Sequence, residues 1–200
     1  MDEPNFIQGT HRMGVAFTFP GQGSQTVGMG QALAQHSAVA RQVFEEVDEA
    51  LGQKLSSIIF EGPDDQLTLT ANAQPALMAV SMALLRALEQ EGFDLARHAT
   101  CVAGHSLGEY SALAAAGSFS LADTARLLRI RGNAMQKAVA PGEGAMAALL
   151  GLDFDAASAV AQEAAQGEVC QAANDNGGGQ VVISGAKAWR PWRKRASACS

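Results

Sequence analysis

The sequence lacks the features of a membrane, secreted or metal-binding protein. Its longest apolar stretch, Ala76–Leu85, is far too short to cross a bilayer, and its first twelve residues lack the long apolar segment of a secretory signal. The three cysteines have no C-x-x-C spacing, and the four histidines show no metal-ligand spacing with one another or with the cysteines. We therefore expect a cytoplasmic protein with free thiols, no membrane segment and no metal site.

Charge is scarce and biased towards acid. Charged residues make up 17% of the 200 residues, and the formal net charge is −6, which disfavours nucleic acid as a partner. The apolar fraction of 48% is ordinary for a globular protein. The length allows one large and one small domain.

The pentapeptide Gly104–Gly108, which reads GHSLG, is the most informative motif. It follows the apolar run Cys101–Ala103 and precedes the helical pattern Glu109–Ala116, the context in which G-x-S-x-G forms a nucleophile elbow. The glycines allow a sharp turn, and the helix N-terminus favours an oxyanion. The motif predicts acyl transfer through an ester of Ser106. The alternative is a plain turn in which Ser106 caps the helix.

A glycine-rich loop, Gly21–Gln25, follows a predicted strand at Val15–Phe19. It lacks the Gly-Lys-Ser/Thr ending of a Walker loop, and Thr26 stands where a dinucleotide fingerprint would have its third glycine. We interpret the loop either as a backbone N–H donor to a substrate carbonyl or as a plain strand-to-helix turn.

Three arginines lie on a predicted helix at residues 120–139. Arg126 points away from the apolar stripe of this helix and is expected to be solvated, whereas Arg129 and Arg131 flank the stripe on opposite sides. Either of these two could bind a substrate carboxylate through paired hydrogen bonds, and helical geometry does not choose between them. A surface ion pair is the alternative for each arginine.

A proton acceptor for Ser106 is harder to find. His105 adjoins the serine, so the two side chains should diverge, and we interpret His105 as a supporting group packed beneath the elbow. His98 should lie at the far end of the sheet, and His36 and His11 lie in exposed contexts. No histidine follows His105, although hydrolase-like sites usually supply their base after the nucleophile.

The pattern of apolar residues changes near residue 140, where we place a domain boundary. The first part predicts strands at 15–19 and 100–103, helices at 29–35, 39–51, 73–91 and 120–139, and a loop around 61–65. One apolar stripe should comprise Leu77, Val80, Leu84 and Leu88, and another Leu121, Ala125, Leu128, Gly132, Met135 and Val139. The second part predicts a strand, a helix and two strands at 145–150, 154–165, 168–173 and 180–184, an order that resembles the start of a ferredoxin-like unit.

The segment from Trp189 to Ser200 differs from the rest of the chain. It holds both tryptophans and four of the fourteen basic residues. One interpretation is an aromatic, basic arm for nucleic acid or anionic lipid. We favour an aberrant C-terminus, such as a frameshift, because no periodicity or repeat accompanies the charge.

Together these motifs resemble the malonyl-CoA:acyl-carrier-protein transacylases of bacterial fatty-acid synthesis. The matching segments are Phe19–Gln25, Gln74–Ala76, Gly104–Tyr110, Arg131–Gly132, Gly144–Ala148 and Gln180–Gly185. The resemblance covers about residues 13–187, and several motifs in register are far more specific than the elbow alone.

The resemblance implies how the site would work. Ser106 would carry the malonyl group as an ester, the backbone N–H groups of Gln22 and Leu107 would form the oxyanion hole, and Arg131 would bind the malonyl carboxylate. Malonyl-CoA would be the donor, and the phosphopantetheine thiol of acyl carrier protein the acceptor. The protein would need no cofactor of its own and would act as a cytoplasmic monomer.

The resemblance also implies the fold. We expect an α/β protein, with an α/β-hydrolase-like larger subdomain and an inserted ferredoxin-like smaller subdomain that is incomplete here. Residues 1–12 would be a disordered extension, 13–139 the larger subdomain, 140–187 the partial smaller one and 188–200 an aberrant basic tail. Gly104, His105 and Gly108 would support the elbow.

The family pattern ends near Ala188, which predicts a truncated or frameshifted chain. Family members continue well beyond residue 200 and supply their catalytic histidine there, so this chain would lack its base. Two alternatives to an active transacylase follow. One is a noncatalytic remnant that only binds malonyl-CoA or acyl carrier protein, and the other is a serine esterase.

Overall fold

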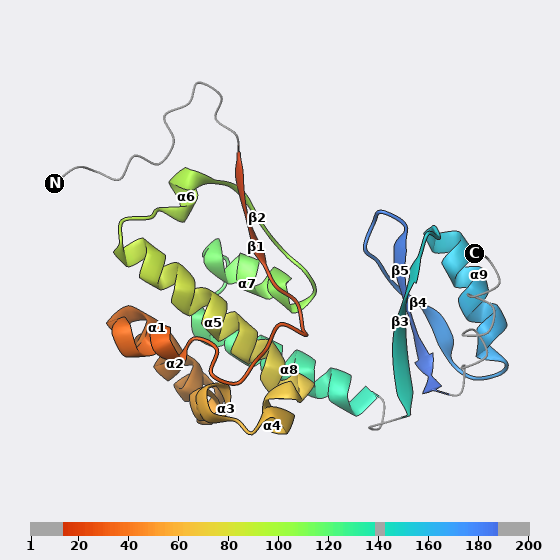
Figure 1. The fold of residues 1–200 in the computed structure, drawn as a ribbon, viewed down its shortest axis with the longest axis horizontal. Helices are drawn as coiled ribbons and strands as arrows, with labels where there is room; N and C mark the ends of the chain where they lie inside the picture. The colour runs from red at the N-terminus through yellow and green to blue at the C-terminus, as the bar shows by residue number, and fades with distance from the viewer. Residues whose placement is uncertain (1–13, 139–142, 188–200) are drawn as a thin grey trace. The chain divides into compact units, whose positions relative to one another are not determined.

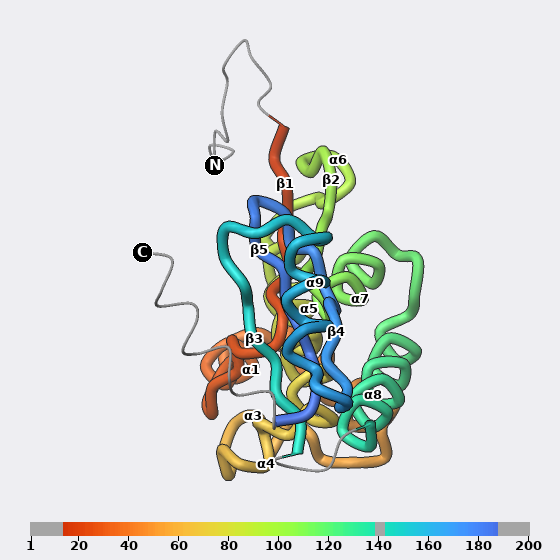
Figure 2. Tube along the Cα trace, turned by 90° about the vertical axis from the view of Figure 1, so that its right-hand side faces the viewer, coloured from red at the N-terminus to blue at the C-terminus, as the bar shows by residue number. Residues whose placement is uncertain are grey.

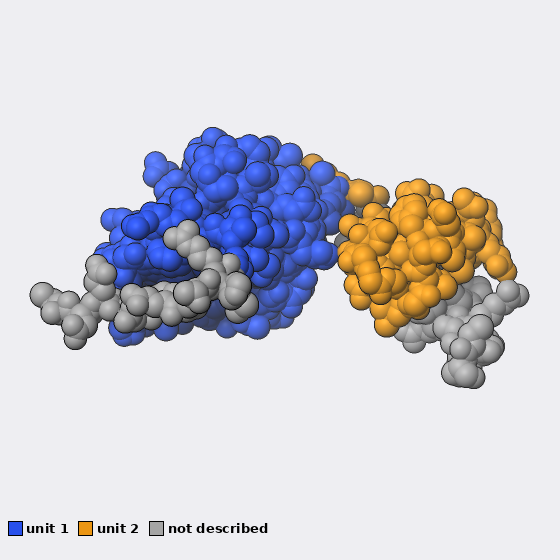
Figure 3. Space-filling model, turned by 90° about the horizontal axis from the view of Figure 1, so that it is seen from above, with its two compact units in different colours: residues 1–135 blue, residues 136–200 orange. Residues whose placement is uncertain are grey.

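The computed structural model describes residues 14–138 and 143–187. The chain forms two compact units, residues 1–135 and 136–200 (Figure 3). The expected extension at 1–12 and the expected tail at 188–200 lie outside the described residues, as does Val139. No helix within the described residues is long and apolar enough to span a membrane.

Two parallel strands form the sheet of the first unit, β1 (Val15–Phe19) and β2 (Ala99–Gly104). Their register pairs Phe19 with Gly104, so the carboxyl ends of both strands lie side by side. Parallel strands require a crossover connection. Here it consists of α1 (Gln31–His36), α2 (Ala38–Leu51), α3 (Leu55–Glu61), α4 (Asp64–Thr68), α5 (Thr70–Gln90) and α6 (Leu95–His98).

Helix α5 lies at the centre of the first unit, with α2 and α7 (Leu107–Ala115) packed against it (Figure 1). The predicted leucine stripe is wrong at two positions, since Leu84 and Leu88 are 52% and 39% exposed. The fully buried positions include Ala76, Ala79 and Ala83. Because neighbours cover α5 on more than one side, small residues that allow close approach decide its buried surface.

Two short helices occupy the region predicted as a loop around residues 61–65. Helix α3 ends at Glu61 and α4 begins at Asp64, so only Gly62 and Pro63 separate them.

Helix α5 also begins earlier than predicted. The backbone N–H groups of Asn72 and Ala73 both donate to the carbonyl oxygen of Leu69 at 2.8 Å, which extends the helix to Thr70.

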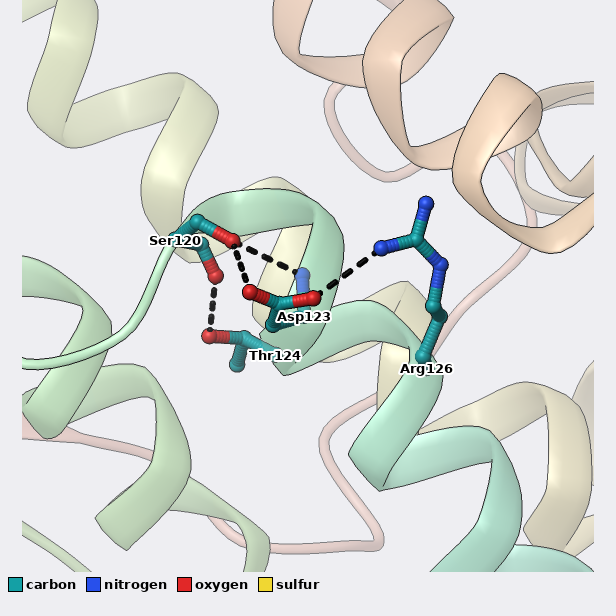
Figure 4. A network of polar contacts seen from close by, with 4 residues as sticks. All are labelled: Ser120, Asp123, Thr124 and Arg126. Atoms are coloured by element: carbon teal, nitrogen blue, oxygen red, sulfur yellow. Dashed lines mark hydrogen bonds and ion pairs between the residues drawn. The ribbon is translucent and has the colours of Figure 1, made fainter.

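Helix α8 (Leu121–Ala138) is capped at its start by reciprocal hydrogen bonds (Figure 4). The Asp123 N–H donates to Ser120 Oγ at 3.0 Å, and Ser120 Oγ donates to Asp123 Oδ2 at 2.7 Å. The hydrogen bond from Ser120 lowers the pKa of Asp123. Arg126 forms an exposed ion pair with the other carboxylate oxygen at 3.0 Å, in line with its predicted solvation.

The buried face of α8 partly follows the predicted stripe. Ala125, Leu128 and Gly132 are buried, as predicted. Met135 is 45% exposed, so the prediction is wrong there. Its sulfur accepts a hydrogen bond from the side-chain amide of Gln74 on α5.

The second unit is an antiparallel sheet with one helix along it. Strands β3 (Gly144–Leu150), β4 (Cys170–Asp175) and β5 (Gln180–Ala186) lie in the order β3-β5-β4. Helix α9 (Phe154–Ala165) covers one face, as both views show (Figure 1, Figure 2). Ala161, Cys170 and Ile183 form the buried cluster between them, and burial raises the pKa of the Cys170 thiol.

Ser120→Ala should lower the free energy of unfolding by about 1 kcal/mol at pH 7, because it removes the cap of α8. Chemical denaturation measures this, with the exposed Ser118→Ala as the control that should not change. Because the folded-state pKa of Asp123 is lowered, its contribution is present above its ordinary pKa of 3.8 and is lost as the pH falls through the folded value. The difference in unfolding free energy between the wild type and Ser120→Ala should therefore become smaller in strong acid. Equal stabilities at pH 7 would contradict the cap.

Candidate active site

Ser106 lies at the turn between β2 and α7, in a strained backbone conformation. Its φ of 58° and ψ of −110° are rarely adopted by residues other than glycine, and such strain costs about 1–3 kcal/mol. The flanking glycines make the turn sterically feasible. A Cβ on Gly104 would collide with the backbone of Gly108, and a Cβ on Gly108 would collide with the carbonyl oxygen of Phe19. The elbow therefore packs directly on the end of β1.

The side chain of Ser106 does not cap α7. Its Oγ instead accepts a hydrogen bond from Arg131 Nη2 at 2.9 Å, and Arg131 is its only side-chain partner among the described residues. The alternative in which the serine is a helix cap is therefore wrong. A strained turn that presents a hydroxyl to a guanidinium is typical of a functional site.

Three neighbours hold the guanidinium of Arg131 in place. Gln74 Oε1 accepts from Nη1 at 2.6 Å, Ser106 Oγ accepts from Nη2, and the ring of Tyr110 lies 5.9 Å from the guanidinium carbon. Gln74 is fully buried, and its Nε2 donates to Met135 Sδ at 3.3 Å. The amide is thus engaged at both ends, which fixes its carbonyl towards Arg131.

Arg129 is directed elsewhere. Its Nη1 donates to Asn72 Oδ1 at 2.6 Å, and its Nη2 donates to Gln53 Oε1 at 2.9 Å. Burial lowers its pKa. Helical geometry left the choice between the two arginines open, and the structure brings Arg131, not Arg129, to Ser106.

The glycine-rich loop lies beside the elbow because β1 and β2 end together. The His105 N–H donates to the carbonyl oxygen of Phe19 at 3.3 Å, and a Cβ on Gly21 would lie 2.7 Å from Nδ1 of His105. Gln22 Nε2 donates to Thr70 Oγ1 at 3.2 Å, which ties the loop to the start of α5. Gly21 therefore lets the loop approach the elbow closely.

The two predicted oxyanion donors lie on this loop and at the first residue of α7. Within the part of the chain that the structure describes, the backbone N–H groups of Gln22 and Leu107 have no hydrogen-bond acceptor. Both donors are thus available to an oxygen atom of a ligand.

Among the described residues, His36 and His98 contact groups other than Ser106, and His105 lies beside the loop, whereas His11 lies outside these residues. His98 stacks on Phe93 with ring centroids 4.9 Å apart, and His36 Nδ1 lies 2.8 Å from the carbonyl oxygen of Ala32. His105 is exposed, so the prediction that it packs beneath the elbow is wrong. Its backbone N–H attaches the elbow to β1.

Sequence reasoning assigned no role to Gln74, Tyr110 or Thr70, although all three contact a predicted site residue. Gln74 carried a usable signal, because a glutamine in an Ala-, Leu- and Met-rich helix must satisfy a buried amide. The contact of Tyr110 with Arg131 joins residues from α7 and α8, and no local pattern reports it. Among the described residues, no group of three His, Cys, Asp or Glu could hold a metal ion.

A model of the acyl transferase domain matches residues 16–189. The chain belongs to this family. It is 50% identical over 172 residues to the malonyl CoA-acyl carrier protein transacylase of Bacillus subtilis and 46% identical to that of Escherichia coli K12. Each alignment covers 86% of this chain but only 53% and 55% of the relative, so the chain spans about half the length of the curated relatives it matches.

Solved structures of family members share this mixed α/β fold. The acyl-carrier-protein S-malonyltransferase of Bartonella henselae superposes with a TM-score of 0.85 at 64% identity, covering 94% of this chain and 60% of its own. A malonyl-transacylase in complex with its type II PKS acyl-carrier protein superposes with a TM-score of 0.78 at 41% identity, covering 92% of this chain and 58% of its own.

Ser106→Gly should be more stable than Ser106→Ala by about 1–3 kcal/mol, because both remove the hydroxyl but only glycine relieves the positive φ. Denaturation curves of the two variants measure the difference. Ala134→Gly, at an exposed position inside α8, is the control. There glycine should lower the free energy of unfolding relative to alanine. An alanine variant at residue 106 as stable as the glycine variant would mean that the elbow is not strained.

Proposed function

We propose that this chain carries the nucleophile and the acyl-binding groups of a malonyl-CoA:acyl-carrier-protein transacylase. The observation that carries the proposal is the 2.9 Å hydrogen bond from Arg131 Nη2 to Ser106 Oγ. A cation at this distance from the nucleophile suits an acyl group with a free carboxylate. The names of the relatives and the complex of one of them with acyl carrier protein point to the same reaction.

The reaction would proceed through an ester of Ser106. Its Oγ attacks the carbonyl carbon of the malonyl thioester, and the backbone N–H groups of Gln22 and Leu107 stabilise the negative charge that develops on the carbonyl oxygen. The carbon–sulfur bond then breaks and the thiol of coenzyme A leaves. In the second half, the phosphopantetheine thiol of acyl carrier protein attacks the ester and releases the serine.

The proton of Ser106 must pass to a base during the first attack. Arg131 cannot accept it, because a guanidinium remains protonated in proteins. We propose that the base is supplied by the part of the longer relatives that this chain does not cover. No resident cofactor takes part in the proposed steps.

The finer fold assignment belongs to the same proposal. Residues 13–139 would be the larger, α/β-hydrolase-like subdomain, in which the elbow follows the second parallel strand. Residues 140–187 would be the first part of the ferredoxin-like subdomain. The order β3-β5-β4 with antiparallel pairing and α9 on one face supports this assignment, since it is the arrangement of a split β-α-β unit.

In a full-length version that includes the base, Ser106→Ala should abolish the acyl adduct that forms with malonyl-CoA, because it removes the attacking oxygen. Intact-mass spectrometry after incubation with malonyl-CoA measures the adduct. Ser118→Ala is the matched control and should retain it. An adduct that persists on the Ser106→Ala chain would identify another nucleophile and overturn the proposal.

Arg131→Met should reduce the preference for malonyl-CoA over acetyl-CoA by about 10- to 100-fold, because a hydrogen bond to a charged group contributes about 1.5–3 kcal/mol. The ratio of the two acylation rates of Ser106 measures this preference. Arg126→Met removes a cation from the same helix at an exposed position and should leave the ratio unchanged. A wild-type chain that prefers acetyl-CoA, or that turns over by hydrolysis alone, would favour an esterase instead.

A further inference from the structure

Helices α5 and α8 meet at backbone contact distance at Gly132. A Cβ built at this residue would lie 2.7 Å from both the carbonyl oxygen of Thr70 and the Cα of Ala71. Ordinary contacts begin at 3.4 Å, so any larger residue would push the helices apart by about 0.7 Å. The atoms it would meet are backbone atoms, which cannot swing aside as a side chain can.

Two arginine–amide pairs flank this contact. With 3.6 residues per turn, Arg129 and Arg131 project on opposite sides of Gly132. Arg129 donates to Asn72 at 2.6 Å on one side, and Arg131 donates to Gln74 at 2.6 Å on the other. The close backbone contact, with a hydrogen bond on each side, fixes both the separation of the two helices and the rotation of α8 about its axis.

We propose that this crossing, formed by Thr70, Ala71, Asn72, Arg129 and Gly132, determines the specificity for carboxylate-bearing acyl groups. Gly132 and Arg129 are positioning residues. They hold α8 where the guanidinium of Arg131 reaches both Gln74 Oε1 and Ser106 Oγ. The inference rests on the proposed function, because it assigns to the crossing the placement of the group that would bind malonyl.

The geometry leaves little tolerance for movement. Arg131 donates at 2.6 Å to Gln74 and at 2.9 Å to Ser106, and a shift of α8 by about 0.7 Å would stretch at least one of these bonds beyond the usual range. A misplacement of about 1 Å in an active site can lower the reaction rate by about 100-fold. The effect should fall on selectivity, since Arg131 itself is still present.

The same turn of α5 also holds the loop of Gln22. Thr70 contributes its carbonyl oxygen to the contact with Gly132, and its Oγ1 accepts from Gln22 Nε2 at 3.2 Å. A displaced crossing would therefore be expected to affect the proposed oxyanion donor as well as the arginine.

Gly132→Ala tests the proposal, with dissociation constants for malonyl-CoA and acetyl-CoA measured by calorimetry on the full chain. We expect the wild type to bind malonyl-CoA more tightly, and the variant to lose that preference by about tenfold or more, as for the loss of a hydrogen bond to a charged group. Alanine is the better helix former, so a loss cannot be attributed to a weakened α8. Asn133→Ala, at the exposed neighbouring position, is the control and should keep the preference.

Arg129→Met is the second variant, in case Gly132→Ala does not fold. No carboxylate pairs with Arg129 among the described residues, so its replacement leaves no anion unpaired there, although the amide oxygens of Asn72 and Gln53 lose their donor. It should reduce the preference by several-fold, whereas Arg126→Met, with the same charge change on the same helix, should not.

The outcomes separate the two ideas. A wild-type chain without preference for malonyl-CoA overturns the proposed function, and this inference with it. A wild type that prefers malonyl-CoA, together with Gly132→Ala and Arg129→Met variants that fold and keep the full preference, overturns the role of the crossing alone. Equal weakening of both ligands would also contradict it, because a purely structural defect has that result.

Discussion

The site depends on the contact between Gly108 and the end of β1. Parallel pairing sets Phe19 beside Gly104, and the missing side chain at Gly108 lets the first turn of α7 rest on the carbonyl oxygen of Phe19. Ser106 must then turn through a strained conformation to connect strand and helix. Because the glycine-rich loop leaves the same end of β1, the loop and the elbow become neighbours by the same contact.

The cation beside Ser106 has a separate structural origin. The strained elbow presents a hydroxyl, but the cation beside it comes from α8, whose position is set by α5. Burying Gln74 is unfavourable unless both ends of its amide are bonded. Arg131 and Met135 meet that need, so the buried amide stabilises the one arrangement in which the guanidinium faces Ser106.

The sequence was most informative where a local steric requirement and a pattern coincided. The elbow could be predicted because two glycines, a strand and a helix all occur within a short segment. The order of strands and helix after residue 143 could be predicted because alternation and turn residues are local signals. The leucine stripe of α5 was wrong at Leu84 and Leu88, because periodicity does not tell how many neighbours cover a helix.

The sequence by itself determined the turn at Ser106, the proposed nucleophile, and the two candidate arginines, since these follow from residue type and spacing along the chain. Only the tertiary structure decided between Arg129 and Arg131 and revealed Gln74 as the group that orients the latter. The reason is that both arginines satisfy the same helical pattern. What distinguishes them is the helix that lies opposite, and that partner is 57 residues away in the chain.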